Sequence, residues 1–170
     1  MPGKVIGIQF NYGYPGTISR LGDEISRTRP KKESTADIYF GDPVIQNTDG
    51  SFQKFGAGNT AAQFAGVAMR RVKSATQYLN QNRGFYTEQE PVDALLCGGV
   101  TVNVNVGTPQ VGGSVYIRVT ANGSIPAGVV GGFEAAADST NTILLTNAKW
   151  ATTKDANGVA ELTILTRQGV

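Results

Sequence analysis

Four valines alternate with small polar residues over residues 100–106, and this two-residue period constrains the fold more than any other feature. Because successive side chains of a β-strand point to opposite faces, the pattern predicts a half-buried strand. Val115, Ile117 and Val119 repeat the pattern, and residues 107–113 between the two runs could form a broad hairpin loop. We therefore expect these two runs to form an antiparallel pair.

Turn signals recur at short intervals along the rest of the chain. Asp49-Gly50 separates residues 38–46 from residues 51–55 in a hairpin pattern. Near the C-terminus, we expect residues 142–146 to pair with residues 159–166, across a polar loop that ends in Asn157-Gly158. Short strands with frequent turns indicate an all-β fold class, with a small antiparallel β-barrel or sandwich as the body, rather than alternating β-α units.

For one segment, the sequence is compatible with either a helix or a strand. Residues 67–81 lack Gly and Pro and could form a helix with a loosely apolar face. The alternative is a strand over residues 64–72 that continues into a loop. We favour the strand, because the turn spacing around it is typical of β-structure.

The N-terminal part of the chain has a different character. Residues 1–37 are polar and are interrupted by Tyr14-Pro15-Gly16 and Arg29-Pro30, which predicts an extended N-terminal arm. Ordering such an arm costs about 1–2 kcal/mol per residue, so its few apolar side chains must be buried against something, and a partner subunit is one such surface. Residues 38–170 form the β-rich body, either as a single domain or as two small β modules.

The absence of histidine and the presence of a single cysteine narrow the possible classes of function. The chain has no histidine, which removes the commonest general base and metal ligand, and Cys97 is its one cysteine, which excludes an internal disulfide. We expect no enzyme activity, no catalytic residue, no metal site and no cofactor. There is no apolar run long enough to span a membrane and no signal-peptide pattern in residues 1–11, so we expect synthesis in the cytoplasm of the producing cell.

The remaining candidates for chemistry have simpler explanations. Glu88, Glu90 and Asp93 could form a hydrolase dyad, but acidic residues beside a proline are common in solvated loops. Cys97 follows two leucines and is expected to be buried and inert. Trp150 could be an exposed binding residue, although a large aromatic among apolar strands more often lies in the core.

Glycine pairs are the last of these candidates. The pairs at residues 98–99, 112–113 and 131–132 match no phosphate-binding fingerprint. We expect loop or bulge glycines at these positions, since glycine allows positive φ and sharp bends.

Charge is distributed unevenly along the chain. Residues 50–87 carry five basic side chains and no acid, whereas residues 88–170 carry four basic and seven acidic side chains. A nucleic-acid surface could use Arg70, Arg71 and Lys73, but the net charge is only +2 and no recognition motif is present. A surface complementary to an acidic patch on a neighbouring subunit fits better.

The order of several segments resembles that of phage structural cement proteins, the capsid head-decoration proteins of tailed bacteriophages. The resemblance covers residues 3–166. The segments are Ile38-Tyr39-Phe40-Gly41-Asp42-Pro43-Val44, Phe64-Ala65-Gly66-Val67-Ala68-Met69-Arg70-Arg71-Val72-Lys73, Pro91-Val92-Asp93-Ala94-Leu95-Leu96, Gly99-Val100-Thr101-Val102, Gly113-Ser114-Val115-Tyr116-Ile117-Arg118-Val119, Gly132-Phe133-Glu134-Ala135-Ala136-Ala137-Asp138, Ala148-Lys149-Trp150 and Ala156-Asn157-Gly158-Val159-Ala160-Glu161-Leu162.

The resemblance implies a virion structural protein that is made in the host bacterial cytoplasm, binds the outer face of the capsid and cements contacts between major capsid protein subunits. It implies two partners, the major capsid protein and other copies of this chain in a homo-oligomer such as a trimer, and neither a specific nucleic acid nor a membrane. The capsid-contact residues we expect are the basic ones of the arm and of the 70–73 segment. They are Arg20, Arg27, Arg29, Lys31, Lys32, Arg70, Arg71 and Lys73.

An alternative function is a β-rich virion surface module that binds host glycans. In that case Trp150 and Tyr116 would be the stacking residues.

Overall fold

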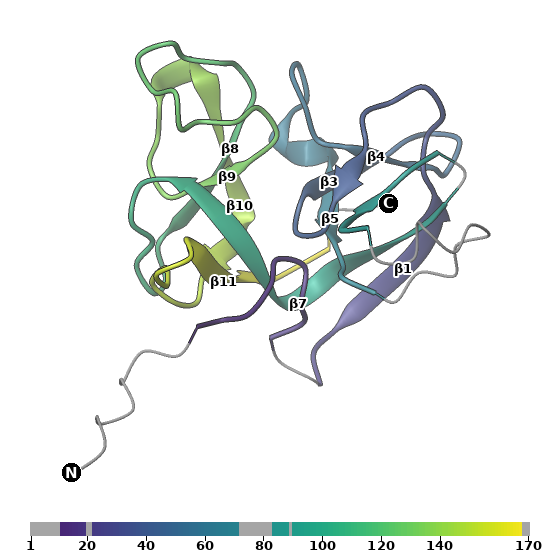
Figure 1. The fold of residues 1–170 in the computed structure, drawn as a ribbon, viewed down its shortest axis with the longest axis horizontal. Coiled ribbons are helices and arrows are strands. Elements are labelled where there is room, and N and C mark those ends of the chain that lie inside the picture. Colours follow the sequence, from purple (N-terminus) through teal and green to yellow (C-terminus); the bar gives the residue numbers. More distant parts are fainter. Residues whose placement is uncertain (1–10, 20–21, 72–82, 89, 168–170) are drawn as a thin grey trace.

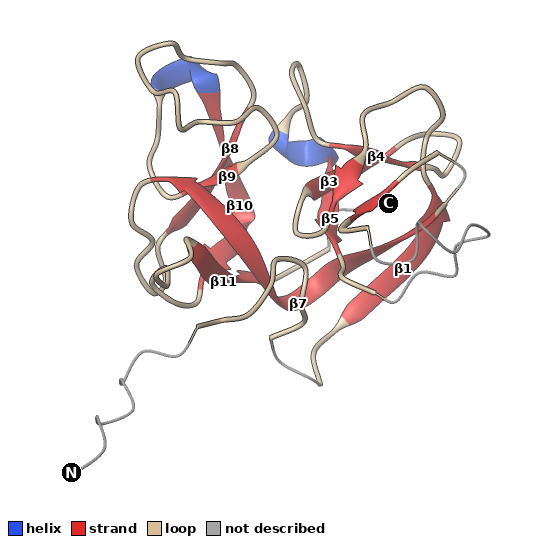
Figure 2. Ribbon diagram, viewed as in Figure 1, coloured by secondary structure: helices blue, strands red, loops and turns tan. Residues whose placement is uncertain are grey.

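The computed structural model describes residues 11–19, 22–71, 83–88 and 90–167. Strands dominate these residues, and the helices among them are two short 3-10 turns (Figure 2). The all-β fold class is therefore confirmed. In chain order the elements are β1 (Ile25–Pro30), β2 (Ile38–Tyr39), β3 (Pro43–Gln46), β4 (Phe52–Lys54), η1 (Ala61–Gln63), β5 (Phe64–Ala68), β6 (Phe85–Tyr86), β7 (Pro91–Val106), β8 (Ser114–Arg118), β9 (Phe133–Glu134), η3 (Ser139–Asn141), β10 (Thr142–Trp150) and β11 (Val159–Ile164).

The 16-residue strand β7 connects two lobes of the molecule (Figure 1). Its N-terminal half pairs with β1 and β5, and its C-terminal half pairs with β11 and β9. Gly98 lies where the halves meet and has a φ of +114°. A Cβ at this position would lie 3.1 Å from the carbonyl oxygen of Asp23, so the backbone conformation and the close approach both favour glycine.

The first lobe is a small barrel. From β7 the pairing runs through β11, β10, β8 and β9 and returns to β7, so the sheet closes on itself. The alternating valines of β7 point into this lobe, where Val100 and Val102 are fully buried. They pack with apolar side chains from every other strand of the barrel, including the fully buried Leu162.

The predicted hairpin between the two valine-rich runs is wrong in its pairing. Both runs are strands, but β9 lies between them, because Phe133 is opposite Val104 on one side and Ile117 on the other. Phe133 is only 2% exposed, so inserting β9 buries a large aromatic ring in the barrel. The β7–β9 pairing is parallel, which a direct hairpin could not produce.

The predicted pairing of residues 142–146 with residues 159–166 is wrong, because Thr142 to Leu145 pair with β8. A later part of β10, Ala148 to Trp150, pairs with β11 instead.

The second lobe contains β1, the N-terminal half of β7, β5, β3 and β4. The hairpin predicted around Asp49-Gly50 is confirmed, since β3 and β4 pair with Gln46 opposite Phe52. A bridge between Lys31 and Phe52 brings the end of β1 back to β4. The short β2–β6 pair covers a second apolar cluster that contains Ile38 and Tyr86.

A strand rather than a helix follows residue 64, as favoured from the sequence. β5 covers Phe64–Ala68 and is buried throughout. A Cβ at Gly66 would lie 2.1 Å from the carbonyl oxygen of Leu95, so this glycine lets β5 approach β7 closely. The remainder of the alternative helix, residues 72–81, lies outside the described residues.

The described part of the predicted arm is extended, but it runs along this chain's own β7. The amide of Gly16 donates to the carbonyl oxygen of Thr101 at 2.7 Å, and β1 continues in the same direction with Arg29 opposite Val92. The surface that receives the described part of the arm is therefore this chain's own β7, and contact with a partner subunit stays a prediction. Residues 1–10 lie outside the described residues, and a domain boundary at residue 37 stays a prediction.

Candidate functional site

Two of the predicted contact residues lie on β1. The six-residue pairing with β7 fixes the backbone of Arg27 opposite Ala94 and that of Arg29 opposite Val92. Arg29 is exposed and Arg27 is half-buried. Neither forms an ion pair with an acidic residue in the part of the chain that the structure describes.

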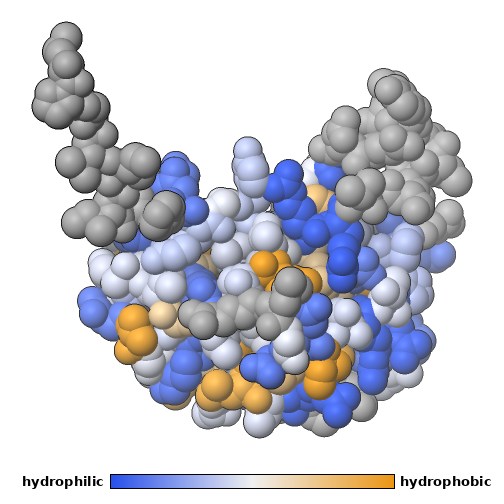
Figure 3. Space-filling model, turned by 90° about the horizontal axis from the view of Figure 1, so that it is seen from below, coloured by the Kyte–Doolittle hydropathy of each residue, from blue (hydrophilic) through white to orange (hydrophobic). Residues whose placement is uncertain are grey.

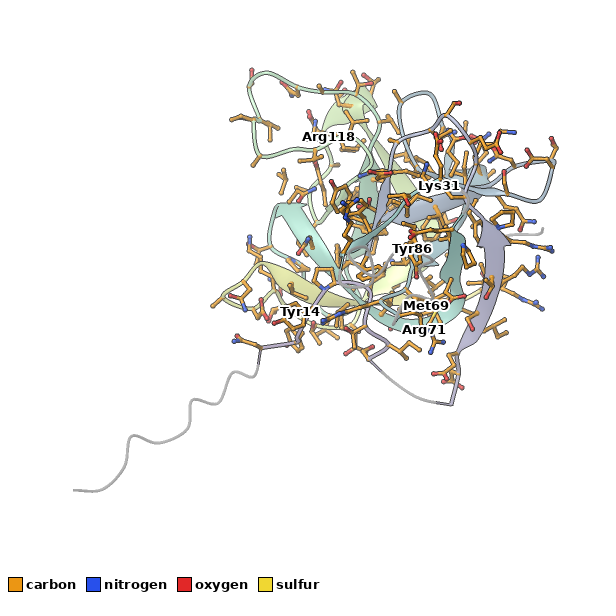
Figure 4. The ribbon with its side chains drawn as sticks, turned by 45° about the vertical axis from the view of Figure 1, so that its right-hand side comes forward. Tyr14, Lys31, Met69, Arg71, Tyr86 and Arg118 are labelled. Atoms are coloured by element: carbon orange, nitrogen blue, oxygen red, sulfur yellow. The ribbon has the colours of Figure 1, made fainter. Side chains whose placement is uncertain are left out.

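Asp93 brings β1 next to the segment that follows β5. Its carboxylate accepts a hydrogen bond from the Thr28 hydroxyl and lies 3.8 Å from Nε of Arg71. Arg71 is labelled in Figure 4. The neighbouring Arg70 packs its guanidinium 4.1 Å from the ring centre of Tyr14. Two pairs of arginines that are far apart in sequence, one on β1 and one after β5, thus flank β7, and we call them the basic band. They are Arg27, Arg29, Arg70 and Arg71.

The other predicted contact residues do not join the basic band. Lys31 is only 2% exposed, and its ammonium donates to the carbonyl oxygen of Thr35 at 2.7 Å, so it is committed to the backbone of its own loop. Lys32 forms an ion pair with Asp49 in the β3–β4 turn. Arg20 and Lys73 lie outside the described residues.

The three acidic residues that could have formed a hydrolase dyad instead bind backbone amides and neighbouring side chains. Glu88 accepts from the amide of Ser34 at 2.8 Å, and Glu90 accepts from the amide of Thr87 at 2.7 Å. Asp93 is engaged by Thr28 and Arg71, as described above. Each carboxylate therefore has a structural partner of its own.

Trp150 and Cys97 are in different environments. Trp150 is 1% exposed, which confirms it as a core residue and excludes it as a stacking platform for a glycan. Cys97 is half-buried rather than fully buried, because it sits near the bend of β7, where its Sγ lies 3.4 Å from the carbonyl oxygen of Ile164.

A buried ion-pair network, which the sequence does not indicate, lies in the first lobe. Arg118, which is labelled in Figure 4, is fully buried. It donates to both carboxylate oxygens of Glu134, at 2.5 and 2.9 Å, and to Asp138 at 2.7 Å. Hydrogen bonding to Glu134 raises the pKa of Arg118. Hydrogen bonds from Asn122, followed by those from Arg118, lower the pKa of Asp138. No local spacing reveals this network, because its members come from separate strands and a loop.

The sequence also does not predict the cleft that lies between the two lobes. One hollow of about 220 Å³ is lined by the β2–β3 turn, the C-terminal part of β7 and the loop before β9. In it, Lys54 forms an ion pair with Asp42 at 2.8 Å, and both side chains remain partly exposed. Burial raises the pKa of Asp42, although Lys54 opposes the shift. A second hollow of about 610 Å³ shares Tyr39 and Lys54 with the first.

The face of the molecule seen in Figure 3 is mainly polar. Figure 3 shows one face on which apolar side chains form small patches separated by polar ones. Among the residues described, no group of three or more acidic or cysteine side chains could hold a metal ion, and no helix has the length and hydropathy to cross a membrane.

The comparisons with known proteins identify the family. The sequence model of the XM1 gp53 minor capsid protein matches residues 3–164. A chain in the solved structure titled "The capsid of Myoviridae Phage XM1" has the same fold, with a TM-score of 0.69 at 15% identity, over 95% of this chain and 94% of that one. No curated protein matches the sequence. With nearly the whole sequence matched, the chain belongs to the XM1 gp53 minor capsid protein family and is a structural, capsid-associated protein of a phage virion.

Proposed function

We propose that this protein binds the outer face of the capsid and cements contacts between major capsid protein subunits through the basic band. The observation that carries the proposal is that arginines lie on both sides of β7, from β1 and from the segment after β5, and that Arg71 is the one of them with an ion pair, to Asp93, within the described residues. A surface with this excess of positive charge is complementary to an acidic patch on a neighbouring subunit.

The geometry of the band suits a stable contact. β1 is hydrogen-bonded to β7 over six residues, so Arg27 and Arg29 are presented from a fixed backbone. Arginine has a planar guanidinium that can bind a carboxylate through two hydrogen bonds. Less conformational entropy is lost on binding when the contact surface is ordered beforehand.

Cementing follows from mass action. A protein that binds only the assembled lattice stabilises that lattice, because disassembly must release every bound copy. We propose that the protein is made in the bacterial cytoplasm, joins the capsid exterior, and works there as a homo-oligomer such as a trimer. The proposed partners include no specific nucleic acid and no membrane.

The test uses capsids prepared without this protein, to which purified protein is added at increasing salt concentration. Charge reversal in the double variant Arg27→Glu/Arg29→Glu should weaken binding about tenfold or more at low salt, with a smaller effect at high salt because ions screen the contact. Lys154→Glu is the matched control, since it reverses an exposed charge outside the basic band.

Two results would contradict the proposal. Unchanged binding of the double variant would remove the basic band as the contact surface. Equal survival on heating of capsids with and without the wild-type protein would show that the protein does not cement the lattice.

A further inference from the structure

The cleft between the lobes has the form of a ligand site. Its two hollows, of about 220 and 610 Å³, meet at Tyr39 and Lys54. The lobes that border the cleft are both anchored to β7, which fixes their spacing (Figure 1). Sites for small molecules are concave, largely preformed, and carry a few placed polar groups, and this cleft meets those criteria.

The polar lining offers unused hydrogen-bonding groups. Asn103 and Asn105 extend from β7 into the smaller hollow, and their amides form no side-chain hydrogen bond within the described residues. The amide of Asn105 lies against Gly132, where a Cβ would be 2.0 Å from its nitrogen, so this glycine makes room for it. Each amide can both donate and accept a hydrogen bond, as a hydroxyl group does.

The charges in the cleft disfavour an anionic ligand. Lys54 is already paired with Asp42, and Asp37 adds a further carboxylate to the lining of the larger hollow. Among the residues that the structure describes, these are the charged side chains that line the two hollows, and their sum is negative. A phosphate, sulfate or carboxylate group would be repelled there.

An aromatic ring lies at the junction of the hollows. Tyr39 is 52% exposed, yet its ring is held in place by Phe85, at 5.1 Å between ring centres, and by the Lys54 ammonium, at 5.6 Å. Val129 is also exposed, at 53%, and lines the smaller hollow. An ordered, half-exposed ring beside free amides is suited to a ligand with both an apolar face and hydroxyl groups.

We propose that the cleft binds a neutral oligosaccharide, with Tyr39 packing against a sugar ring and Asn103 and Asn105 hydrogen-bonding its hydroxyls. A capsid peptide fits less well, because energetically important protein contacts are usually aromatic or apolar anchors in well-packed pockets, and the larger hollow is lined mainly by polar surface. The basic band contributes nothing to this site, so the inference does not rest on the cementing function.

The experiment screens the purified protein against an array of neutral hexose and N-acetylhexosamine oligosaccharides, with sulfated and sialylated ones as comparison. The best neutral oligosaccharide is then titrated by calorimetry into the wild type and variants. Tyr39→Ala and Asn103→Ala should each weaken binding about tenfold, the size expected for losing one stacking or hydrogen-bonding contact. Tyr14→Ala is the matched control, since Tyr14 is a more exposed tyrosine, at 66%, outside the cleft.

Thermal unfolding of each variant establishes that it is folded before binding is compared. Retention of neutral oligosaccharides by the wild type and by Tyr14→Ala, but not by the two cleft variants, supports the proposal. Binding confined to anionic glycans, an equal loss in Tyr14→Ala, or no binding to any oligosaccharide would overturn it. Loss of capsid attachment in Tyr39→Ala, without sugar binding by the wild type, would assign the cleft to the capsid instead.

Discussion

Removing Arg118 should destabilise the protein more than removing any exposed arginine. The Arg118→Met variant keeps a side chain of similar length but leaves the fully buried Glu134 without its cationic partner. The loop above is also fitted to the guanidinium, because a Cβ at Gly128 would lie 2.2 Å from Nε of Arg118. The variant therefore loses an ion pair and opens a cavity beneath that loop.

The expected loss of stability follows from the burial of Glu134. Breaking a buried ion pair by removing one partner typically costs about 3–5 kcal/mol, because the remaining charge stays desolvated. For a chain of this size, 1 kcal/mol corresponds to a change of about 3 °C in Tm, so a loss of about 4 kcal/mol predicts a fall of about 12 °C. The double variant Arg118→Met/Glu134→Leu should recover much of that loss, since apolar replacement of both partners is often neutral.

Differential scanning calorimetry of the wild type, of the single variants Arg118→Met and Glu134→Leu, and of the double variant measures these changes in Tm. The matched control is Arg29→Met, which removes an exposed arginine without an ion-pair partner in the described structure and should change Tm little. A fall in Tm no larger for Arg118→Met than for Arg29→Met would refute the reasoning. A double variant less stable than Arg118→Met would refute the explanation by an unpaired buried charge.

Three further predictions concern other parts of the fold. Gly66→Ala should lower Tm markedly, since its Cβ would meet the Leu95 carbonyl oxygen at 2.1 Å, whereas Gly123→Ala, with no atom within 4 Å, should not. Trp150→Ala should cost about 3–5 kcal/mol in chemical denaturation, but Trp150→Phe much less, because the indole N–H has no hydrogen-bond partner in the described structure; equal costs would contradict this. Since the folded state lowers the pKa of Asp138, its stabilisation is full above the ordinary value of 3.8 and is lost as pH falls through the folded value. Unfolding of Asp138→Asn should therefore depend less on pH than that of the wild type below about pH 4, and identical profiles would exclude the effect.

Local patterns predicted strands better than they predicted pairings. The valine alternation at residues 100–106 identified part of β7, and Asp49-Gly50 identified the β3–β4 turn, because both signals depend on a few adjacent residues. The predicted pairing partner of β7 was wrong, because β9 has only two strand residues and its sequence pattern is too short to be recognised. Its position depends on burying Phe133 among distant strands.

For the candidate sites too, local features could be predicted from the sequence, whereas long-range contacts could not. The arginines of the basic band were all predicted as contact residues from charge, and this role stays a prediction. The sequence could not separate them from Lys31, which is buried because its loop supplies carbonyl acceptors. The inter-lobe cleft had no signal at all. Tyr39, Asp42 and Asn105 are ordinary residues of separate elements and form a site only through the pairing around β7.

The sequence alone determined that this chain is a β-protein without histidine, since periodicity, turn residues and composition are properties of the chain itself. Only the tertiary structure decided that the N-terminal segment runs along β7, that Arg118 is buried, and that the two lobes form a cleft. Each of these depends on contacts between residues far apart in sequence. The free energy of such contacts comes from burial and long-range pairing, which no local pattern records.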